Sequence, residues 1–196
     1  MGITAALVKE LRERTGIGMM ECKKALLECN GEIEEAIKLL RKKGFARAEK
    51  RSGRQTSEGL VGSYIHMNGK LGVLVELNCE TDFVARNDEF QKLLKNISLH
   101  IAAANPQYVS SDEIPEAVVE EEKEIIREQL KDSKKPPEIM EKIITGKLGK
   151  FYSEVCLVDQ TYIKDDKITI QELISSFVAK TGENVRVGRF VRYAIG

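Results

Sequence analysis

The stretch that decides the fold is residues 60–77, LVGSYIHMNGKLGVLVEL. Two β-rich runs, residues 60–66 and 70–77, are joined through Asn68-Gly69, a dipeptide typical of the turn of a β-hairpin. In the second run every other residue is apolar, which predicts a strand with one buried face; these residues are Leu71, Val73, Val75 and Leu77. We therefore expect an antiparallel hairpin at the centre of the fold.

The rest of the chain supplies a third strand and several helices. Residues 185–195 alternate in the same way and predict a strand that pairs with the hairpin. Residues 88–104 predict a helix whose inward residues are Phe90, Leu93, Leu94, Ile97 and Ile101. A second helix is expected after Thr169, which has capping-box spacing to Glu172.

Residues 115–148 have the pattern of a helical hairpin. Its turn is expected at residues 132–136, and Pro137 suits the first turn of the second arm. The predicted fold class is thus α+β. A three-stranded antiparallel sheet is covered by helices, and a helical hairpin is inserted at about residues 115–148.

Residues 1–55 predict a small helical module. Three amphipathic segments are separated by Thr15-Gly16 and Asn30-Gly31; Thr4 suits the first N-cap, and the third helix is expected to end at Gly44. The residues expected to face inward are Leu7, Val8, Leu11, Met19, Cys22, Ala25, Leu26, Cys29, Ile33, Ala36, Ile37 and Leu40. Such a short bundle has a marginal core of its own and is usually stabilised by a binding partner or by packing against the rest of the chain. We expect two domains, residues 1–55 and 56–196.

A net charge of zero conceals an uneven distribution. The 31 Lys and Arg residues balance 31 Asp and Glu residues, yet residues 1–55 hold 13 basic and 8 acidic residues, net +5. The basic residues at 41–54 predict a solvated linker; they are Arg41, Lys42, Lys43, Arg47, Lys50, Arg51 and Arg54. The alternative is an electrostatic handle for RNA or an acidic protein, although Phe45 is the only aromatic residue among these charges, where single-strand binding would favour several.

Cysteine and histidine usage argues against a metal site. Cys22, Cys29, Cys79 and Cys156 form no Cys-x-x-Cys pair, and His66 and His100 are the only histidines. We expect reduced thiols in a cytosolic protein, with an exposed Cys156 that links two chains as the alternative. No apolar run approaches the roughly 20 residues of a membrane helix. Met1 leads directly into an amphipathic pattern, so no secretory signal is expected.

Residues 78–88, NCETDFVARND, stand out between the second strand and the following helix. Asn87 or Asp88 can cap that helix. Phe83, on an expected surface loop, is either an anchor for a partner or a core residue. The chain has no phosphate-binding loop, dinucleotide fingerprint or zinc-protease motif. An enzyme with Cys79 or Asp82 as the catalytic group is a weak alternative, because no base partner is evident.

Three stretches resemble signatures of the bacterial elongation factor Ts family. Residues 8–26, VKELRERTGIGMMECKKAL, resemble its N-terminal signature, and residues 81–87, TDFVARN, resemble the second. Residues 180–184, KTGEN, resemble a third. Their order and spacing match over essentially the whole chain, which looks like a short form of the family. Ile17 and Glu21 stand where relatives often carry Ala and Asp.

This resemblance implies a guanine-nucleotide exchange factor for elongation factor Tu, with no enzymatic activity and no cofactor. It implies that residues 1–55 form a ubiquitin-associated-like module and that Arg12, Met19 and Met20 contact the GTPase. Neighbouring residues cannot share a helix face, so at least one of the two methionines fits the core instead.

By the same resemblance, Thr81, Asp82, Phe83 and Val84 would enter beside the magnesium site of the GTPase. A cytoplasmic protein with no direct nucleic-acid or membrane binding is implied, and a homodimer is left open. The competing interpretation is a ribosome- or RNA-associated protein that uses the basic module, whose affinity should fall steeply with salt.

Overall fold

The computed structural model describes residues 3–131 and 136–196. The chain divides into two compact units. The first comprises Met1–Val61, Glu76–Leu94 and Glu172–Arg186. The second comprises Gly62–Val75, Lys95–Gln171 and Val187–Gly196. All three strands and two of the helices contribute residues to both units.

Three helices begin the first unit: α1 (Ala5–Thr15), α2 (Met19–Glu28) and α3 (Ile33–Arg51). The Thr4 side chain caps α1 by accepting from the backbone N–H of Leu7, and Gly16 ends α1 in the left-handed conformation, as predicted. The bundle core consists of Val8, Leu11, Ile17, Cys22, Ala25, Leu26, Ala36 and Leu40. Met19, expected inside, is instead 56% exposed.

The predicted end of the third helix at Gly44 is wrong, because α3 continues to Arg51. Gly44 is buried, and a Cβ at this position would lie 3.2 Å from Cβ of Ala179. The missing side chain therefore allows α3 to approach α8 (Ile170–Thr181) closely. Residues 41–51 are consequently helical and do not form a linker. The division into domains 1–55 and 56–196 stays a prediction.

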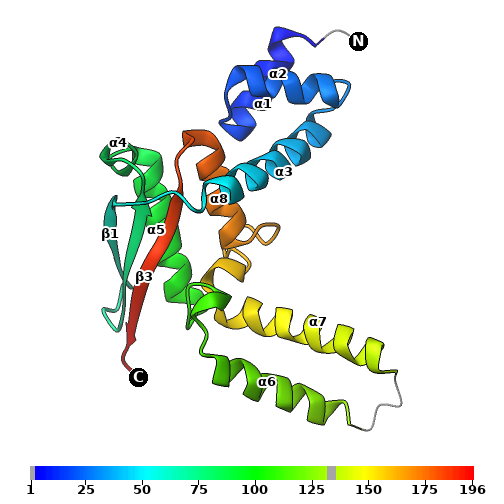
Figure 1. Ribbon diagram of the computed structural model, residues 1–196. Coiled ribbons are helices and arrows are strands. Elements are labelled where there is room, and N and C mark those ends of the chain that lie inside the picture. The colour runs from blue at the N-terminus through cyan, green and yellow to red at the C-terminus, as the bar shows by residue number, and fades with distance from the viewer. Residues whose placement is uncertain (1–2, 132–135) are drawn as a thin grey trace. The chain divides into compact units, whose positions relative to one another are not determined.

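The sheet contains β1 (Glu58–Ile65), β2 (Leu71–Cys79) and β3 (Val185–Ala194). It is antiparallel, with β2 in the centre, which confirms the hairpin and its pairing with the third strand (Figure 1). In the turn, the Gly69 N–H donates to the His66 carbonyl at 2.7 Å, and Gly69 has a positive φ of 69°. Val73, Val75 and Leu77 are buried, as their alternation predicts.

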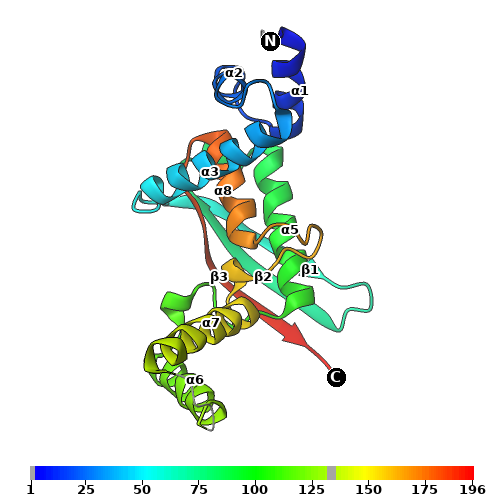
Figure 2. The ribbon, with the colours of Figure 1, turned by 90° about the vertical axis from the view of Figure 1, so that its right-hand side faces the viewer.

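The predicted helix at residues 88–104 is confirmed as α5 (Asp88–Ala104), and all five residues expected inside are buried. Asn87 caps it, since its side chain accepts from the Glu89 N–H at 2.8 Å. In the first unit α5 and α8 lie side by side (Figure 2), with the rings of Phe90 and Phe177 5.9 Å apart. The short helix α4 (Asp82–Ala85) precedes α5.

The second unit contains the predicted helical hairpin, α6 (Glu116–Gln129) and α7 (Pro137–Val155). Ile126, Ile144 and Leu148 form its core, and Ile125 is 44% exposed. Residues 132–135 of the predicted turn lie outside the described residues. Two 3-10 turns, η1 (Ser111–Glu113) and η2 (Leu157–Asp159), flank the hairpin.

All four cysteines are free thiols. Cys156 is fully buried, so the alternative of an exposed Cys156 that links two chains is wrong. Among residues 3–131 and 136–196, no group of three or more His, Cys, Asp or Glu side chains is arranged to hold a metal ion. Within the same ranges, no helix combines the length and apolar character that crossing a membrane requires.

Candidate functional site

Within residues 78–88, Asp82–Ala85 form a single helical turn, α4, where the sequence predicted a loop. Thr81 is its N-cap and accepts from the backbone N–H of Val84 at 3.5 Å. Phe83 points outward and is 83% exposed, which contradicts the core alternative for this residue. Asp82 pairs with Arg86 across one turn at 3.0 Å and keeps 46% of its side chain exposed.

The start of α4 is fastened to the connection between α8 and β3. The carboxylate of Glu183 accepts from the Thr81 hydroxyl at 2.7 Å and from the Thr81 backbone N–H at 3.0 Å. In the opposite direction, the backbone N–H of Asn184 donates to Glu80 at 2.6 Å. We call these four residues the clasp. Gly182, with φ of 81°, ends α8 and turns the chain into it.

The clasp also holds the segment that follows α3. The Asn184 side-chain amide donates to the carbonyls of Ser52 and Arg54 at 3.3 and 3.0 Å. The Arg54 guanidinium lies 3.4 Å from the Glu80 carboxylate. Asn184 is only 5% exposed, so the two hydrogen bonds of its amide are shielded from competing water. Within the first unit, Asn184 therefore binds both the segment that follows α3 and Glu80, the residue before the N-cap of α4.

The environment of Cys79 disfavours the thiolate form that a nucleophilic cysteine needs. Its Sγ donates to the Thr81 carbonyl, and burial, followed by the charges of Glu183 and Glu58, raises its pKa to about 11. A thiol needs a lowered pKa to attack as a thiolate at neutral pH, so this site gives no support to a catalytic Cys79.

Both histidines make hydrogen bonds to neighbouring side chains. In the second unit, His100 is fully buried and hydrogen-bonds to Gln160 at 3.0 Å. His66 is exposed and hydrogen-bonds to the Tyr64 hydroxyl. Each therefore has a local partner that explains its position.

The second set of predicted contacts, Arg12, Met19 and Met20, lies at one end of the helical module. Arg12 is exposed in the last turn of α1, and the methionines open α2 after a connection of three residues. Met19 and Met20 are 56% and 68% exposed, so the core alternative fails for both. The same connection contacts α8, since a Cβ on Gly16 would lie 2.7 Å from Lys180 Cε.

The basic run of residues 41–54 is largely engaged within the first unit. Lys43 pairs with Glu28, and Arg47 pairs with Glu21, whose pKa is lowered chiefly by the hydrogen bond from Arg47. Arg51 donates to the Val178 carbonyl, and Arg54 lies against Glu80. Cations held in this way are less available for phosphates, which weakens the RNA-binding alternative.

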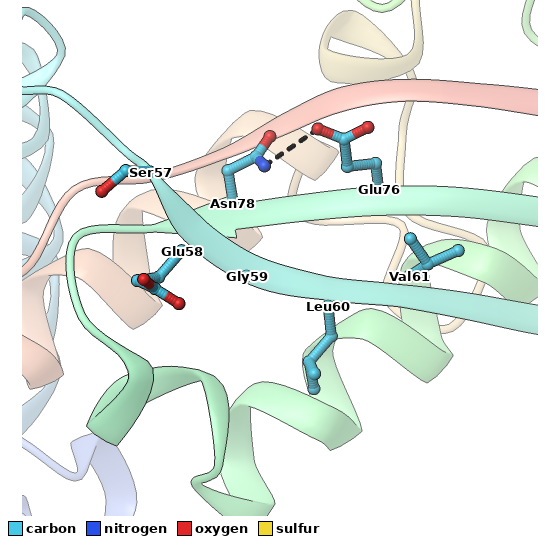
Figure 3. Close-up of a pocket in the computed structure, with 7 residues that line it drawn as sticks. All are labelled: Ser57, Glu58, Gly59, Leu60, Val61, Glu76 and Asn78. Atoms are coloured by element: carbon cyan, nitrogen blue, oxygen red, sulfur yellow. Dashed lines mark hydrogen bonds between the residues drawn. The ribbon is translucent and has the colours of Figure 1, made fainter.

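A hollow of about 260 Å³ lies beside β1 and is lined by Ser57, Glu58, Gly59, Leu60, Val61, Glu76 and Asn78 (Figure 3). Gly59 is required there, because a Cβ would lie 2.3 Å from the Leu77 carbonyl oxygen. Asn78 donates to Glu76, two residues before it on β2, at 3.0 Å (Figure 3). It is smaller than usual ligand pockets, and none of the predicted contact residues lines it.

Sequence reasoning missed the clasp residues Glu80, Glu183 and Asn184 as structural partners of the singled-out segment. Glu183 and Asn184 belong to the KTGEN stretch, so the available signal was the presence of two polar residues directly after a helix-ending glycine. Their pairing with Glu80 and Thr81 spans more than 100 residues, which no local pattern reports.

The chain is similar to known proteins over essentially its whole length. The family model described as Elongation factor TS matches residues 4–196. A protein named Elongation factor Ts from Fervidobacterium nodosum is 58% identical over 196 residues, which cover 100% of both chains. One from Thermosipho melanesiensis is 56% identical over 194 residues, 99% of each chain. One from Geobacter sulfurreducens is 55% identical over 196 residues, 100% of this chain and 91% of the relative.

Proposed function

Because the chain belongs to the elongation factor Ts family, and is therefore a translation elongation factor, we propose that it is the guanine-nucleotide exchange factor of elongation factor Tu. It binds the GDP-bound GTPase, disturbs its magnesium site and promotes release of GDP, so that GTP can bind. The observation that carries this proposal is Phe83, an exposed aromatic side chain on a fastened helical turn.

A magnesium site is a sensitive target for such a side chain. Mg²⁺ demands near-ideal octahedral geometry and bridges nucleotide phosphates to protein ligands. A small displacement of those ligands therefore weakens both the ion and GDP. Phe83 is a rigid wedge with few rotatable bonds, and Asp82 beside it can hold displaced polar groups. Thr81 and Val84 complete the contact segment.

The helical module supplies the second contact. Met19 and Met20 are flexible, polarizable and exposed, properties that suit an adaptable apolar contact. Arg12 adds a cation at the same end of the module. The helical module holds the GTPase, whereas Phe83 displaces the ligands of its magnesium ion. Affinity and exchange therefore depend on different side chains.

Binding of the factor and binding of GDP to the GTPase are thermodynamically linked. If the factor weakens GDP binding, GDP weakens binding of the factor by the same ratio. The factor accelerates release without choosing between GDP and GTP, and the cellular concentrations decide which nucleotide binds next. This task forms and breaks no covalent bond, so we propose no enzymatic activity, no cofactor and a cytoplasmic location. Formation of a homodimer stays a prediction.

Replacing Phe83 by Ala tests the proposal. We expect the fold to persist, because the side chain is exposed, and stimulated release of a fluorescent GDP from elongation factor Tu in stopped flow to slow by about tenfold or more, the factor for a loss of ~1.4 kcal/mol. Met67→Ala is the control, since Met67 is also an exposed apolar side chain, in the β1–β2 turn. Release as fast with Phe83→Ala as with Met67→Ala would remove the wedge.

A further inference from the structure

We propose that Glu183 is a positioning residue for Phe83: its carboxylate fixes the start of α4 and thereby sets the direction in which the Phe83 ring points. This inference rests on the proposed function and deepens it. Glu183 does not itself touch nucleotide or magnesium in this scheme. It acts through Thr81, with which it makes two hydrogen bonds.

Helix α4 cannot hold Phe83 in place by itself. It comprises only the four residues Asp82–Ala85, and a single helical turn is unfavourable in isolation because nucleation fixes several residues for very few hydrogen bonds. Its orientation therefore depends on its N-cap, Thr81. The two bonds to Glu183 fix both the backbone and the side chain of Thr81, which leaves little freedom to the first turn.

The bonds are strong for their kind. Both donors of Thr81 meet an ionised acceptor, and charge-assisted bonds are about twice as strong as neutral ones. The return bond from the Asn184 N–H to Glu80 prevents the two connections from sliding past each other. Thr81 donates to Glu183, whereas the next residue, Asn184, donates back to Glu80. A shift of one connection along the other would therefore break both pairs.

The same connection reaches the end of the helical module. The Asn184 amide binds the carbonyls of Ser52 and Arg54, so the residue next to Glu183 anchors the segment that leaves α3. Within the first unit, the turn that carries Phe83 and the segment after α3 are therefore both hydrogen-bonded to the same short connection, residues 183–184. A wedge acts only when it is rigid relative to what binds the partner, because a mobile ring would turn aside instead of displacing the partner's residues.

This role separates two measurable quantities. Loosening Thr81 should lower the maximal rate of stimulated GDP release at saturating factor. It should change the concentration of factor that gives half that rate much less, because Arg12, Met19 and Met20 still bind. A residue with only a general stabilising role would alter the unfolding midpoint and leave the saturating rate of the folded protein unchanged.

The side chain at position 183 can be varied in two steps. Glu183→Ala removes both acceptors, and we expect the saturating rate to fall by about tenfold or more, as for the loss of at least one charge-assisted bond. Glu183→Gln can still accept from the Thr81 N–H and donate to its hydroxyl, so we expect a rate within about twofold of the unchanged protein. Glu120→Ala is the control, because it removes an exposed carboxylate paired with Lys123 on α6.

The decisive experiment is a double-mutant cycle in the stopped-flow assay with Glu183→Ala, Phe83→Ala and both together. If Glu183 acts through Phe83, its removal should have no further effect once Phe83 is Ala. Amide hydrogen exchange should also accelerate at Val84 and Ala85 in Glu183→Ala, while the amides of the buried α5 residues stay protected.

The outcomes are distinct. Additive effects in the cycle, or a saturating rate unchanged by Glu183→Ala while Phe83→Ala slows release, would overturn the positioning role and leave the proposed function intact. An unchanged rate with Phe83→Ala would overturn the wedge itself, and the positioning role with it. A non-additive cycle with faster exchange at Val84 supports both.

Discussion

Phe83 shows why exposure alone does not identify a contact residue. Single exposed apolar side chains are common on protein surfaces, and Met67 is even more exposed than Phe83 at 97%. What distinguishes Phe83 is the clasp beneath it, where charge-assisted bonds fix a turn that has almost no stability of its own. Constraint of this kind is expected where a side chain must keep its direction while it pushes against a partner.

Met19 and Met20 allow a prediction about affinity. Replacing both by Ala should weaken binding to nucleotide-free elongation factor Tu by about tenfold or more, because two apolar side chains would no longer be buried in the complex. The free energy of unfolding should barely change, since both are exposed. Calorimetric titration measures the affinity, and Leu27→Ala is the control, because Leu27 is 57% exposed on the same helix. Equal losses for both variants would contradict a specific methionine contact.

Met19 was predicted to face inward but is exposed, and the reason is clear. Met19 precedes Cys22 by three positions, so helical periodicity assigned both to the inner face. Ile17, from the connection before α2, fills the core at this end instead, and Cys22 Sγ contacts its carbonyl. Periodicity describes a helix but not the residues of a neighbouring connection that compete for the same space.

Helix α3 depends on contacts that its own sequence does not reveal. A glycine within a run of charges favours a helix end, yet α3 continues because Gly44 packs against Ala179 and because Lys43 and Arg47 pair with acidic residues of α2. These tertiary contacts outweigh a glycine penalty of about 1 kcal/mol. The strands and α5, in contrast, were predictable because their own alternation or periodicity decides which face is buried.

Gly44→Val should lower the free energy of unfolding by about 1–3 kcal/mol, because the added branch must be placed where Ala179 already lies. Gly44→Ala should change it little, since improved helix propensity offsets a contact at 3.2 Å. Urea denaturation measures both, with Gly53→Ala as the control at a position where a Cβ meets nothing within 4 Å. A valine variant as stable as the original protein would mean that α3 and α8 need no close approach.

For the whole molecule, the α+β class and the strand pairing followed from local patterns, whereas the clasp did not. Thr81 and Glu183 are 102 residues apart, and nothing in either segment indicates the other. The family resemblance indicated the Thr81–Val84 segment as a contact but not what holds it. Sites built from distant polar residues escape sequence reasoning because hydrogen-bond partners leave no periodic trace.

The stability of the folded chain should depend on pH through His100. This residue is buried; its Nδ1 accepts from the Ile163 N–H at 3.4 Å, and its Nε2 faces the Gln160 carbonyl oxygen at 3.0 Å. Gln160 is oriented by its own amide, which donates to the Glu154 carbonyl. The neutral Nε2–H tautomer satisfies both contacts, whereas a proton on Nδ1 would oppose the Ile163 N–H.

Burial, more strongly than the opposing hydrogen bond to Gln160, lowers the pKa of His100 below its usual 6.5. Below that pH the unfolded chain binds a proton that the folded chain does not, so stability falls as pH falls, by at most about 1.4 kcal/mol per pH unit. His100→Gln should therefore cost more stability at pH 7 than at pH 5, as measured by urea denaturation at each pH. His66→Gln, at an exposed histidine, is the control, and a cost for His100→Gln that stays constant across this range would show that His100 is not held neutral.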